Sequence, residues 1–451
     1  MITHRKFLGI FLAVCCFLSG CAGSAPASTE TPTAAPTAAP TVPAPEIRDW
    51  AAEIQPSADT LKQEVTVKSF IDGDTTHFHL QESVNGEMVL KARYLAVNTP
   101  ESTGKIEEYG KTASQFTREK LQNAEKILVE SEDGNWNPDS GGERTLVWVW
   151  YVPQGETAWR CLNVELLQEG LANANSSARN RYGETCMAAI EQAKYQKKNL
   201  YSGRKDPNFY YGEAVELTLK ELRTNIAQYN GVKVAFNGII TTNSGTQGVY
   251  IEDYDPELDR YFGIYIYYGH NLNGAGLDVL SVGNEARIVG TVQYYEAGGT
   301  WQVAGVNYRM MQPDDPGNIQ KLSEGNAPAW VLTDPETFAV GTVTLETETG
   351  EQSFSHAQLA LGTSVSMKGL TVTDAYTTSN PDSSSDGAIT LTCEADGFTV
   401  TVRTAVLWDE NGERITQDAF LGRTIDVMGI VDFFDGAYQI KVFSPNHITI
   451  N

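Results

Sequence analysis

Four side chains in the first half of the sequence have types and an order suited to phosphate chemistry: Asp74, Arg93, Glu101 and Arg144. Asp74 follows an Asp-Gly pair that predicts a hairpin turn, which places its carboxylate at the mouth of the outgoing strand. A carboxylate suits a hard cation, and a second carboxylate can act as a base. Two guanidinium groups can hold a phosphate in a bidentate manner. Together these residues could bind a cation, activate water and hold a phosphate, which are the functions needed to hydrolyse a phosphodiester.

Each of these residues also has a purely structural interpretation. Asp74 alone could be a turn acceptor, Arg93 an ion-pair partner at a strand edge, and Glu101 a solvated loop carboxylate. His77 and His79 share one face of the same predicted strand. Because no third ligand lies in register with them, we expect surface histidines rather than a metal site.

The elements that must position these residues can be predicted from hydrophobic periodicity. Residues 65–97 alternate as strands do, and TLVWVWYV is β-branched and aromatic, which predicts a buried strand. Apolar stripes at helical spacing predict three helices, within 111–124, 162–172 and 184–201. The unit is predicted to be a small β-barrel or sheet with about three helices, α+β in class.

The ordered series of motifs resembles the staphylococcal (micrococcal) nuclease family. IDGDT is followed by RYLAVNTPE, EEYGKTAS, Arg144, LNVELLQEGLA and AIEQAKYQKKNLYSG. The series covers residues 65–203, about a third of the chain, and is far more specific than any single motif. The resemblance implies a domain at 61–205 with a five-stranded OB-type β-barrel and three helices.

The resemblance also implies a calcium site. Asp74 and Asn98 would bind Ca²⁺, with the main-chain carbonyl of Thr99 assisting. The family usually has aspartate where this sequence has Asn98. An amide oxygen still coordinates Ca²⁺, but the loss of one formal charge is expected to weaken metal binding.

The catalytic roles are likewise implied by the resemblance. Glu101 would position or deprotonate the attacking water, and Arg93 and Arg144 would hold the phosphate and stabilise its transition-state charge. Family members cleave single-stranded DNA and RNA and leave 3′-phosphates. The segment NANSSARN lacks the tyrosines that pack the nucleotide in the family, and Tyr182 lies near but out of place.

The second half of the chain repeats itself. VGNEARIVGTVQYYEAGGTWQV from Val282 matches LGRTIDVMGIVDFFDGAYQI from Leu421, with glycines at equivalent places. The repeat predicts two all-β OB-like barrels, at 213–312 and 338–451. Aromatic residues such as Tyr265, Tyr267 and Tyr268 could stack on bases, or could be core and cross-strand pairs.

The charge is concentrated in that second half. Residues 62–205 hold 18 Lys and Arg against 20 Asp and Glu, a net of −2, whereas residues 206–451 hold 12 against 32, a net of −20. The second half is therefore a poor candidate for gripping a phosphate backbone. The first half is near neutral, which leaves room for a local basic cleft.

The N-terminus has the layout of an export signal. Basic residues precede a short apolar run, so residues 1–20 are expected to be a signal peptide and Cys21 the site of lipidation, as in bacterial lipoproteins; an ordinary signal peptide cleaved elsewhere is the alternative. Residues 21–60 are rich in Pro, Ala and Thr and predict a tether. Cys161 and Cys186 could form a disulfide or remain separate buried thiols.

These patterns predict a monomeric, extracytoplasmic, lipid-anchored nuclease that uses Ca²⁺ and acts on single-stranded DNA or RNA. The alternative is a catalytically inactive surface protein that binds nucleic acid or cell-wall glycan through the same folds. Asn98 favours this alternative, whereas Arg93, Glu101 and Arg144 argue against it, because a decayed site has no reason to retain all three.

Overall fold

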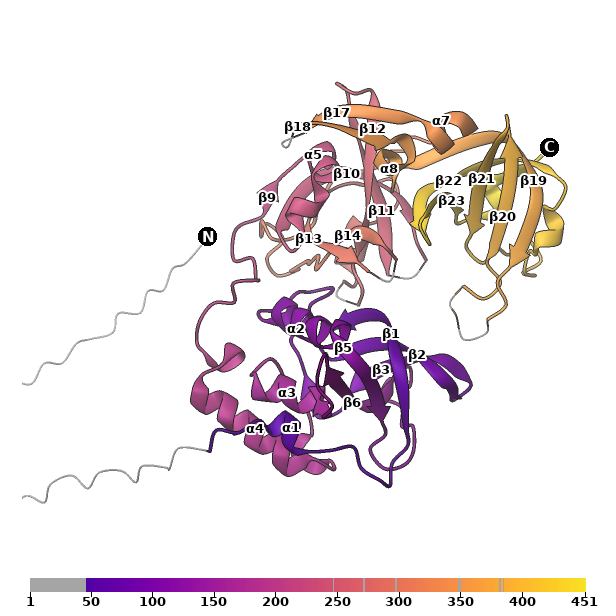
Figure 1. The fold of residues 1–451 in the computed structure, drawn as a ribbon. Coiled ribbons are helices and arrows are strands. Elements are labelled where there is room, and N and C mark those ends of the chain that lie inside the picture. Colours follow the sequence, from indigo (N-terminus) through magenta and orange to yellow (C-terminus); the bar gives the residue numbers. More distant parts are fainter. Residues whose placement is uncertain are drawn as a thin grey trace, which may run out of the picture. The chain divides into compact units, whose positions relative to one another are not determined.

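The computed structural model describes residues 46–451 except positions 246, 271, 297, 348, 349, 381, 382 and 384. The predicted signal peptide, the predicted lipidation site Cys21 and most of the predicted tether lie outside these residues. In the described part of the chain, no helix is long and apolar enough to cross a membrane. Three larger sheets follow one another along the sequence (Figure 1).

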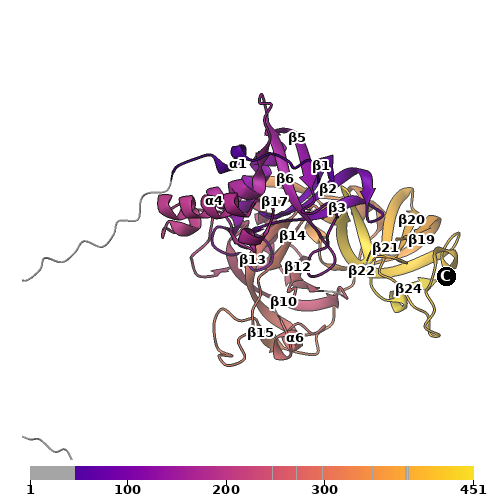
Figure 2. The same cartoon turned by 90° about the horizontal axis from the view of Figure 1, so that it is seen from below.

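The first sheet is a closed barrel. Its strands are β1 (Lys62–Asp72), β2 (Thr75–Val84), β3 (Glu87–Tyr94), β5 (Ala124–Glu130), β6 (Thr145–Pro153) and β7 (Arg160–Cys161), in the order β3-β2-β1-β5-β6-β7. A parallel pairing of β3 with β6 closes it. Figure 2 shows β1, β2, β3, β5 and β6 side by side. A short pair, β4 (Val97–Asn98) and β8 (Asn173–Ala174), lies beyond β3. The predicted α+β barrel is confirmed.

Three helices pack with this barrel: α2 (Gly110–Gln122), α3 (Leu162–Gln168) and α4 (Gly183–Gln196). The predicted C-terminal ends of α3 and α4 lie several residues beyond the observed ones. Helix α3 ends early because Gly170 adopts φ +64°, where a Cβ would lie 2.7 Å from the Lys198 carbonyl oxygen. Helix α4 ends in the left-handed Lys197, and a separate 3₁₀ turn, η2 (Asn199–Tyr201), follows.

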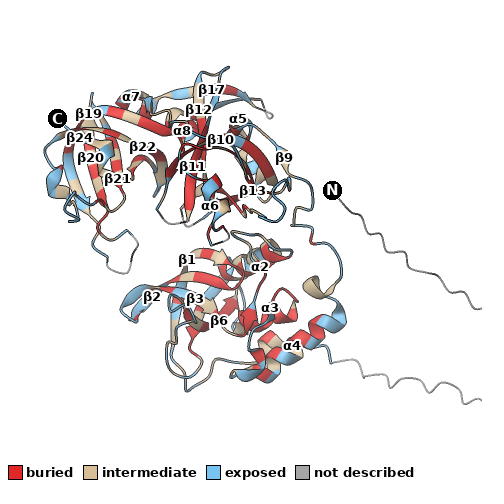
Figure 3. Cartoon of the chain, turned by 180° about the vertical axis from the view of Figure 1, so that it is seen from behind, coloured by how far each residue is buried: buried red, intermediate tan, exposed pale blue. Residues whose placement is uncertain are grey.

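The core of this unit lies between β6 and the helices. Every residue of α3 is buried, while α4 buries one face only (Figure 3). Trp148 and Trp150 of β6 are fully buried, and Tyr182 packs edge-on against both rings. Tyr182 is therefore a structural residue at the start of α4. Smaller elements complete the unit: α1 (Trp50–Glu53) and η1 (Ser177–Arg179).

The second and third sheets have the same strand order. The second consists of β9 (Val215–Glu216), β10 (Lys233–Asn243), β11 (Gly248–Asp255), β12 (Arg260–Tyr267), β13 (Glu285–Tyr295), β14 (Thr300–Ala304) and β15 (Gln320–Ser323). The third consists of β16 (Val331–Leu332), β19 (Ser364–Thr377), β20 (Ile389–Ala395), β21 (Phe398–Thr404), β22 (Thr424–Phe434), β23 (Ala437–Val442) and β24 (Ile448–Ile450). Pairings β10–β13 and β19–β22 close the two barrels, which confirms the predicted all-β class.

The repeated glycines have a physical cause. A Cβ on Gly290 of β13 would lie 2.6 Å from Val303, and one on Gly429 of β22 would lie 2.6 Å from Ile440. Val303 and Ile440 occupy equivalent positions on β14 and β23. Each glycine therefore leaves room for the neighbouring strand to cross closely.

The second and third sheets share a packed junction. The hairpin of β17 (Thr342–Thr347) and β18 (Gly350–Ser355) places Leu345 and Phe354 in the core of the second barrel. The buried Glu252 of β11 accepts hydrogen bonds from the Ser364 N–H at 2.7 Å, the Ser364 hydroxyl at 2.8 Å and the Ala329 N–H at 2.8 Å. The remaining short helices are α5 (Leu219–Thr224), η3 (Ile226–Tyr229), α6 (Ala275–Val279), α7 (Pro335–Val340), α8 (His356–Ala360), η4 (Gln417–Ala419) and η5 (Pro445–His447).

The structure shows the surroundings of two pairs of side chains. Cys161 and Cys186 are both buried and free, so they are separate thiols. His77 is half-buried and His79 exposed, and no cluster of three metal-ligating His, Cys, Asp or Glu side chains includes them in the part of the chain described.

A single hydroxyl ties helix α2 to the hairpin turn, and its removal tests how firmly. The buried Thr117 hydroxyl donates to the Gly73 carbonyl at 2.6 Å. Thr117→Val keeps the shape but leaves a buried carbonyl without a partner, which we expect to cost about 1–3 kcal/mol of unfolding free energy. Urea unfolding followed by tryptophan fluorescence measures this. Thr117→Ser keeps the hydroxyl and is the control; equal stability of the two variants would contradict the role of this bond.

Candidate active site

The hairpin turn differs from the prediction by one position. Asp72 pairs with Thr75, so Gly73 and Asp74 are the two turn residues, and Asp74 belongs to the turn rather than to the outgoing strand. A Cβ on Gly73 would lie 2.9 Å from the Thr99 side chain. Glycine is therefore required here by the close approach of the segment that follows β4, which carries the other half of the site.

The Asp74 carboxylate is buried and fully engaged. One oxygen accepts the Thr99 N–H at 2.9 Å, and the other accepts the Thr75 hydroxyl at 3.2 Å and forms an ion pair with Arg93. Burying a carboxylate is tolerated only where such partners compensate its lost hydration. The short ladder of β4 brings Asn98 to the same place, and Arg93 donates to the Asn98 side-chain oxygen at 2.6 Å.

Arg93 and Arg144 lie near one another. Burial lowers the pKa of Arg93, and the Arg144 charge lowers it further. Arg144 precedes β6, and Asp139 holds its guanidinium at 2.7 and 2.8 Å. The Arg144 side chain remains 42% exposed. Two neighbouring guanidinium groups repel unless an anion lies between them, so the pair is suited to a phosphate.

Asp72 is a site residue that sequence reasoning missed. It was assigned to the turn alone, but its buried carboxylate accepts the Gly73 N–H at 2.7 Å and the Ser102 N–H at 3.2 Å, and hydrogen-bonds with Glu101. Partial burial of the Glu101 carboxyl, together with the Asp72 charge, raises the pKa of Glu101 to about 7. Two carboxyl groups in contact share a proton more readily than they both ionise. The sequence signal that could have indicated this role is the second aspartate of IDGDT, since the motif contains both Asp72 and Asp74.

The loop carrying Glu101 is fixed from both sides. Its carbonyl accepts the Glu107 N–H at 2.8 Å, and a Cβ on Gly110 would lie 2.1 Å from the Glu101 carbonyl oxygen. At the start of α2, Asp206 accepts the Tyr109 N–H at 2.7 Å and the Thr112 hydroxyl at 2.9 Å. Asp206 lies just after residue 205, the predicted end of the first domain, and is a structural part of this unit.

The donor set fits a hard cation. Asp74, Asn98 and the Thr99 carbonyl offer only oxygens, with Asp72 and Glu101 adjoining. Thr99 also carries a buried hydroxyl oxygen with no hydrogen-bond partner among the residues described. Set against this, the described residues contain no group of three His, Cys, Asp or Glu side chains arranged to hold a metal. The one-carboxylate set with Asn98 is thus chemically suitable but weak.

The structure places residues 173–176, in the segment lacking the family tyrosines, on the surface.

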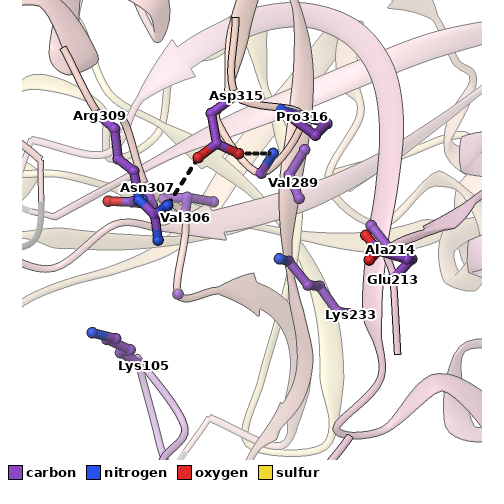
Figure 4. Close-up of a pocket in the computed structure, with 12 residues that line it drawn as sticks. Lys105, Glu213, Ala214, Lys233, Val289, Val306, Asn307, Arg309, Asp315 and Pro316 are labelled. Carbon is purple, nitrogen blue, oxygen red and sulfur yellow. Dashed lines mark hydrogen bonds and ion pairs between the residues drawn. The ribbon is translucent and has the colours of Figure 1, made fainter. Parts of the chain in front are cut away.

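A separate cavity of about 630 Å³ is lined by Lys233, Val289, Val306 and Asn307 of the second barrel, with Lys105 the one labelled residue from the nuclease unit (Figure 4). None of the predicted catalytic residues lines it. Nothing in this cavity bears on the chemistry described above.

Comparison with known proteins finds similarity over the same part of the chain. A family model described as "Staphylococcal nuclease homologue" matches residues 91–203. The chain is 33% identical over 149 residues to a "Thermonuclease" of Staphylococcus intermedius, covering 32% of this chain and 78% of that relative. It is 33% identical over 145 residues to a "Thermonuclease" of Staphylococcus hyicus, covering 31% and 77% respectively.

The raised pKa of Glu101 gives a pH-dependent stability. With a folded-state pKa of about 7, the folded protein holds this proton more tightly than the unfolded chain does. The associated stabilisation is present below the ordinary glutamate pKa of about 4.3 and is lost as the pH rises through about 7. In EDTA, the unfolding free energy of the wild type relative to Glu101→Gln should therefore fall across this window. A flat difference between pH 4.5 and 7.5 would contradict the raised pKa that burial and the Asp72 charge give Glu101.

Proposed function

This chain belongs to the staphylococcal nuclease family, and we propose that its first barrel is a Ca²⁺-dependent phosphodiesterase that cleaves single-stranded DNA and RNA to 3′-phosphate products. The observation that carries the proposal is the convergence of Arg93, Arg144 and the Asp72–Glu101 pair beside the buried Asp74. Hydrolysis of a phosphodiester needs a proton acceptor for water and positive charge for the phosphate, and this arrangement offers both.

Glu101 is the proposed acceptor of the proton from the attacking water. With a pKa of about 7, it is a sufficiently strong base near neutral pH and is increasingly ionised above it. The water oxygen forms a bond to phosphorus, the bond from phosphorus to the 5′ oxygen breaks, and that oxygen takes up a proton from solvent. The 3′ side keeps the phosphate, and the other product carries a 5′-hydroxyl group.

Arg93 and Arg144 would hold the phosphate and stabilise the additional negative charge of the transition state. Arg93 contacts Asp74 and Asn98, so it must exchange at least one of these partners for the substrate. Asp139 orients Arg144 without covering it. A Ca²⁺ ion held by Asp74, Asn98 and the Thr99 carbonyl would supply further positive charge next to the phosphate.

The location of the activity is also a proposal. The apolar run before Cys21 and the Pro-, Ala- and Thr-rich segment after it support a lipid-anchored, extracytoplasmic monomer. Ca²⁺ is abundant outside cells, so a weak site could still fill there. The competing function is an inactive binding protein. It is favoured by Asn98, which leaves the ligand set with one formal charge fewer than the family's usual aspartate.

The loss of the base tests the nuclease directly. Glu101→Gln removes the proton acceptor, and we expect cleavage of single-stranded DNA to fall by about 10²-fold or more. The measurement is an initial rate on a labelled strand across a Ca²⁺ titration, with EGTA to abolish activity. Glu82→Gln on the exposed part of β2 is the matched control and should behave as wild type. Intact substrate with the folded wild type at millimolar Ca²⁺ would favour the inactive binding protein.

The charge lost at Asn98 has a measurable cost. Asn98→Asp adds a carboxylate to the ligand set, and we expect Ca²⁺ affinity to rise on the order of tenfold because ligand charge tunes such sites. Titration calorimetry in the Glu101→Gln background separates binding from turnover. Asn173→Asp is the matched control, since Asn173 pairs with Asn98 across β4 and β8 and adds the same charge outside the ligand set. Equal gains in the two variants would mean that position 98 is not a ligand.

A further inference from the structure

A large cavity adjoins the junction of the second and third barrels. Its volume is about 1540 Å³, and most of its lining residues come from these two barrels. Pockets for small ligands are typically ~300–1,000 Å³. This cavity is therefore large enough for a segment of a polymer, and none of the predicted catalytic residues lines it.

One lining residue is a buried cation without a counter-ion. Arg223 of α5 is 8% exposed, and its Nη2 donates to the Gln358 carbonyl at 3.0 Å. Its Nε is buried without a hydrogen-bond partner, and no carboxylate pairs with Arg223 within the described chain. Burial lowers the pKa of Arg223 to about 10, with only Tyr438 acting against the shift. An uncompensated buried charge is costly, which favours an anion as the missing partner.

Aromatic side chains from both barrels line the same cavity. Tyr295 at the end of β13 and Phe434 at the end of β22 line the cavity with 46% and 63% of their surface exposed. Tyr250 and Tyr265 also line the cavity. Their ring centroids lie 5.0 Å apart, so each ring already has part of its surface in contact with the other. Exposed rings along a cleft provide stacking surfaces for bases, and such stacking tolerates any sequence.

The charge of the lining differs from that of its surroundings. Residues 206–451 carry a net charge of −20, yet within this part the lining holds three cations and three anions, a net of zero. The cations are Arg223, Arg403 and Lys441, and the anions are Glu296, Asp432 and Asp435. A polyanion repelled elsewhere on these barrels can thus enter here, and a neutral glycan would leave Arg223 unpaired.

We propose that this cavity binds a segment of single-stranded nucleic acid, with bases on the aromatic rings and one phosphate on Arg223. The inference rests on the proposed function only in its choice of ligand, which is the substrate of the nuclease. A strand held here stays at high effective concentration near an active site on the same chain. The second and third barrels then serve to retain long substrates.

The test is fluorescence anisotropy of a labelled dT₁₂ strand with the full chain carrying Glu101→Gln, in EGTA, so that no cleavage occurs. The variant Tyr295→Ala/Phe434→Ala removes one exposed ring from each barrel, and we expect affinity to fall by about tenfold or more. The matched control is Tyr254→Ala/Trp408→Ala, which removes one ring of 42% and one of 49% exposure, also one from each barrel but outside the cavity. Equal affinities of the two double variants would overturn the proposal.

Salt dependence separates the role of Arg223 from that of the rings. Each phosphate neutralised on a single strand contributes about −0.7 to the slope of log K against log salt. Arg223→Gln should therefore reduce this slope by about 0.7, whereas Tyr295→Ala/Phe434→Ala should lower affinity with the slope unchanged. Circular dichroism identifies a folding failure of the arginine variant, and the ring variant then decides. Tighter binding of a neutral polysaccharide than of dT₁₂, independent of salt, would overturn the proposal.

Cleavage assays keep this inference separate from the nuclease itself. In the chain with Glu101 intact, cavity variants should cleave a trinucleotide normally and a long strand more slowly. If neither substrate is cleaved by the wild type while dT₁₂ binding depends on Tyr295 and Phe434, the nuclease proposal fails and the binding site stands. If both substrates are cleaved equally well by all variants, the nuclease stands and the binding site is overturned.

Discussion

The burial of the Asp74 carboxylate is the constraint on which the site depends. A carboxylate removed from water must be compensated, and here the compensation comes from the Thr99 N–H and the Arg93 guanidinium. Thr99 reaches it only because Gly73 lacks a side chain. The turn, the end of β3 and the segment after β4 are therefore held together by one charge. The same charge is what a hard cation would use, so stability and metal binding draw on the same oxygens.

The loop that carries Glu101 is held in place by distant parts of the chain. Glu101 follows an extended segment and has no regular structure of its own. Its carbonyl accepts the Glu107 N–H just before α2, and α2 is in turn held by Asp206 and Thr117. These hydrogen bonds join residues far apart in the sequence: Tyr109 and Asp206 are separated by 97 positions, and Thr117 and Gly73 by 44. Glu101 is thus held in place while the residue as a whole stays exposed to solvent and its carboxyl is partly shielded beside Asp72.

Much of this could be predicted from the sequence because the signals were local or came in series. Alternating apolar and polar residues predicted the strands, and apolar residues at helical spacing predicted the helices to within a few residues. The ordered series of motifs predicted the α+β barrel. The one-position shift of the turn, the early ends of α3 and α4, and the roles of Asp72 and Asp206 were not predicted. Each depends on a contact distant in sequence, such as Asp72 with Ser102 or Gly170 with Lys198, and no local propensity contains that information. The burial of Arg223 is of the same kind.

The uneven charge raises a physical question for a chain proposed to act on polyanions. A net of −20 on the second half would repel a nucleic acid if it acted as a single sum. At physiological ionic strength, however, exposed charges are screened beyond about 8 Å, so the local distribution decides. The near-neutral first barrel and the charge-balanced lining of the cavity that contains Arg223 are two places where a phosphate would meet less repulsion. The acidity elsewhere would disfavour non-specific adhesion of a nucleic acid to the rest of the second half.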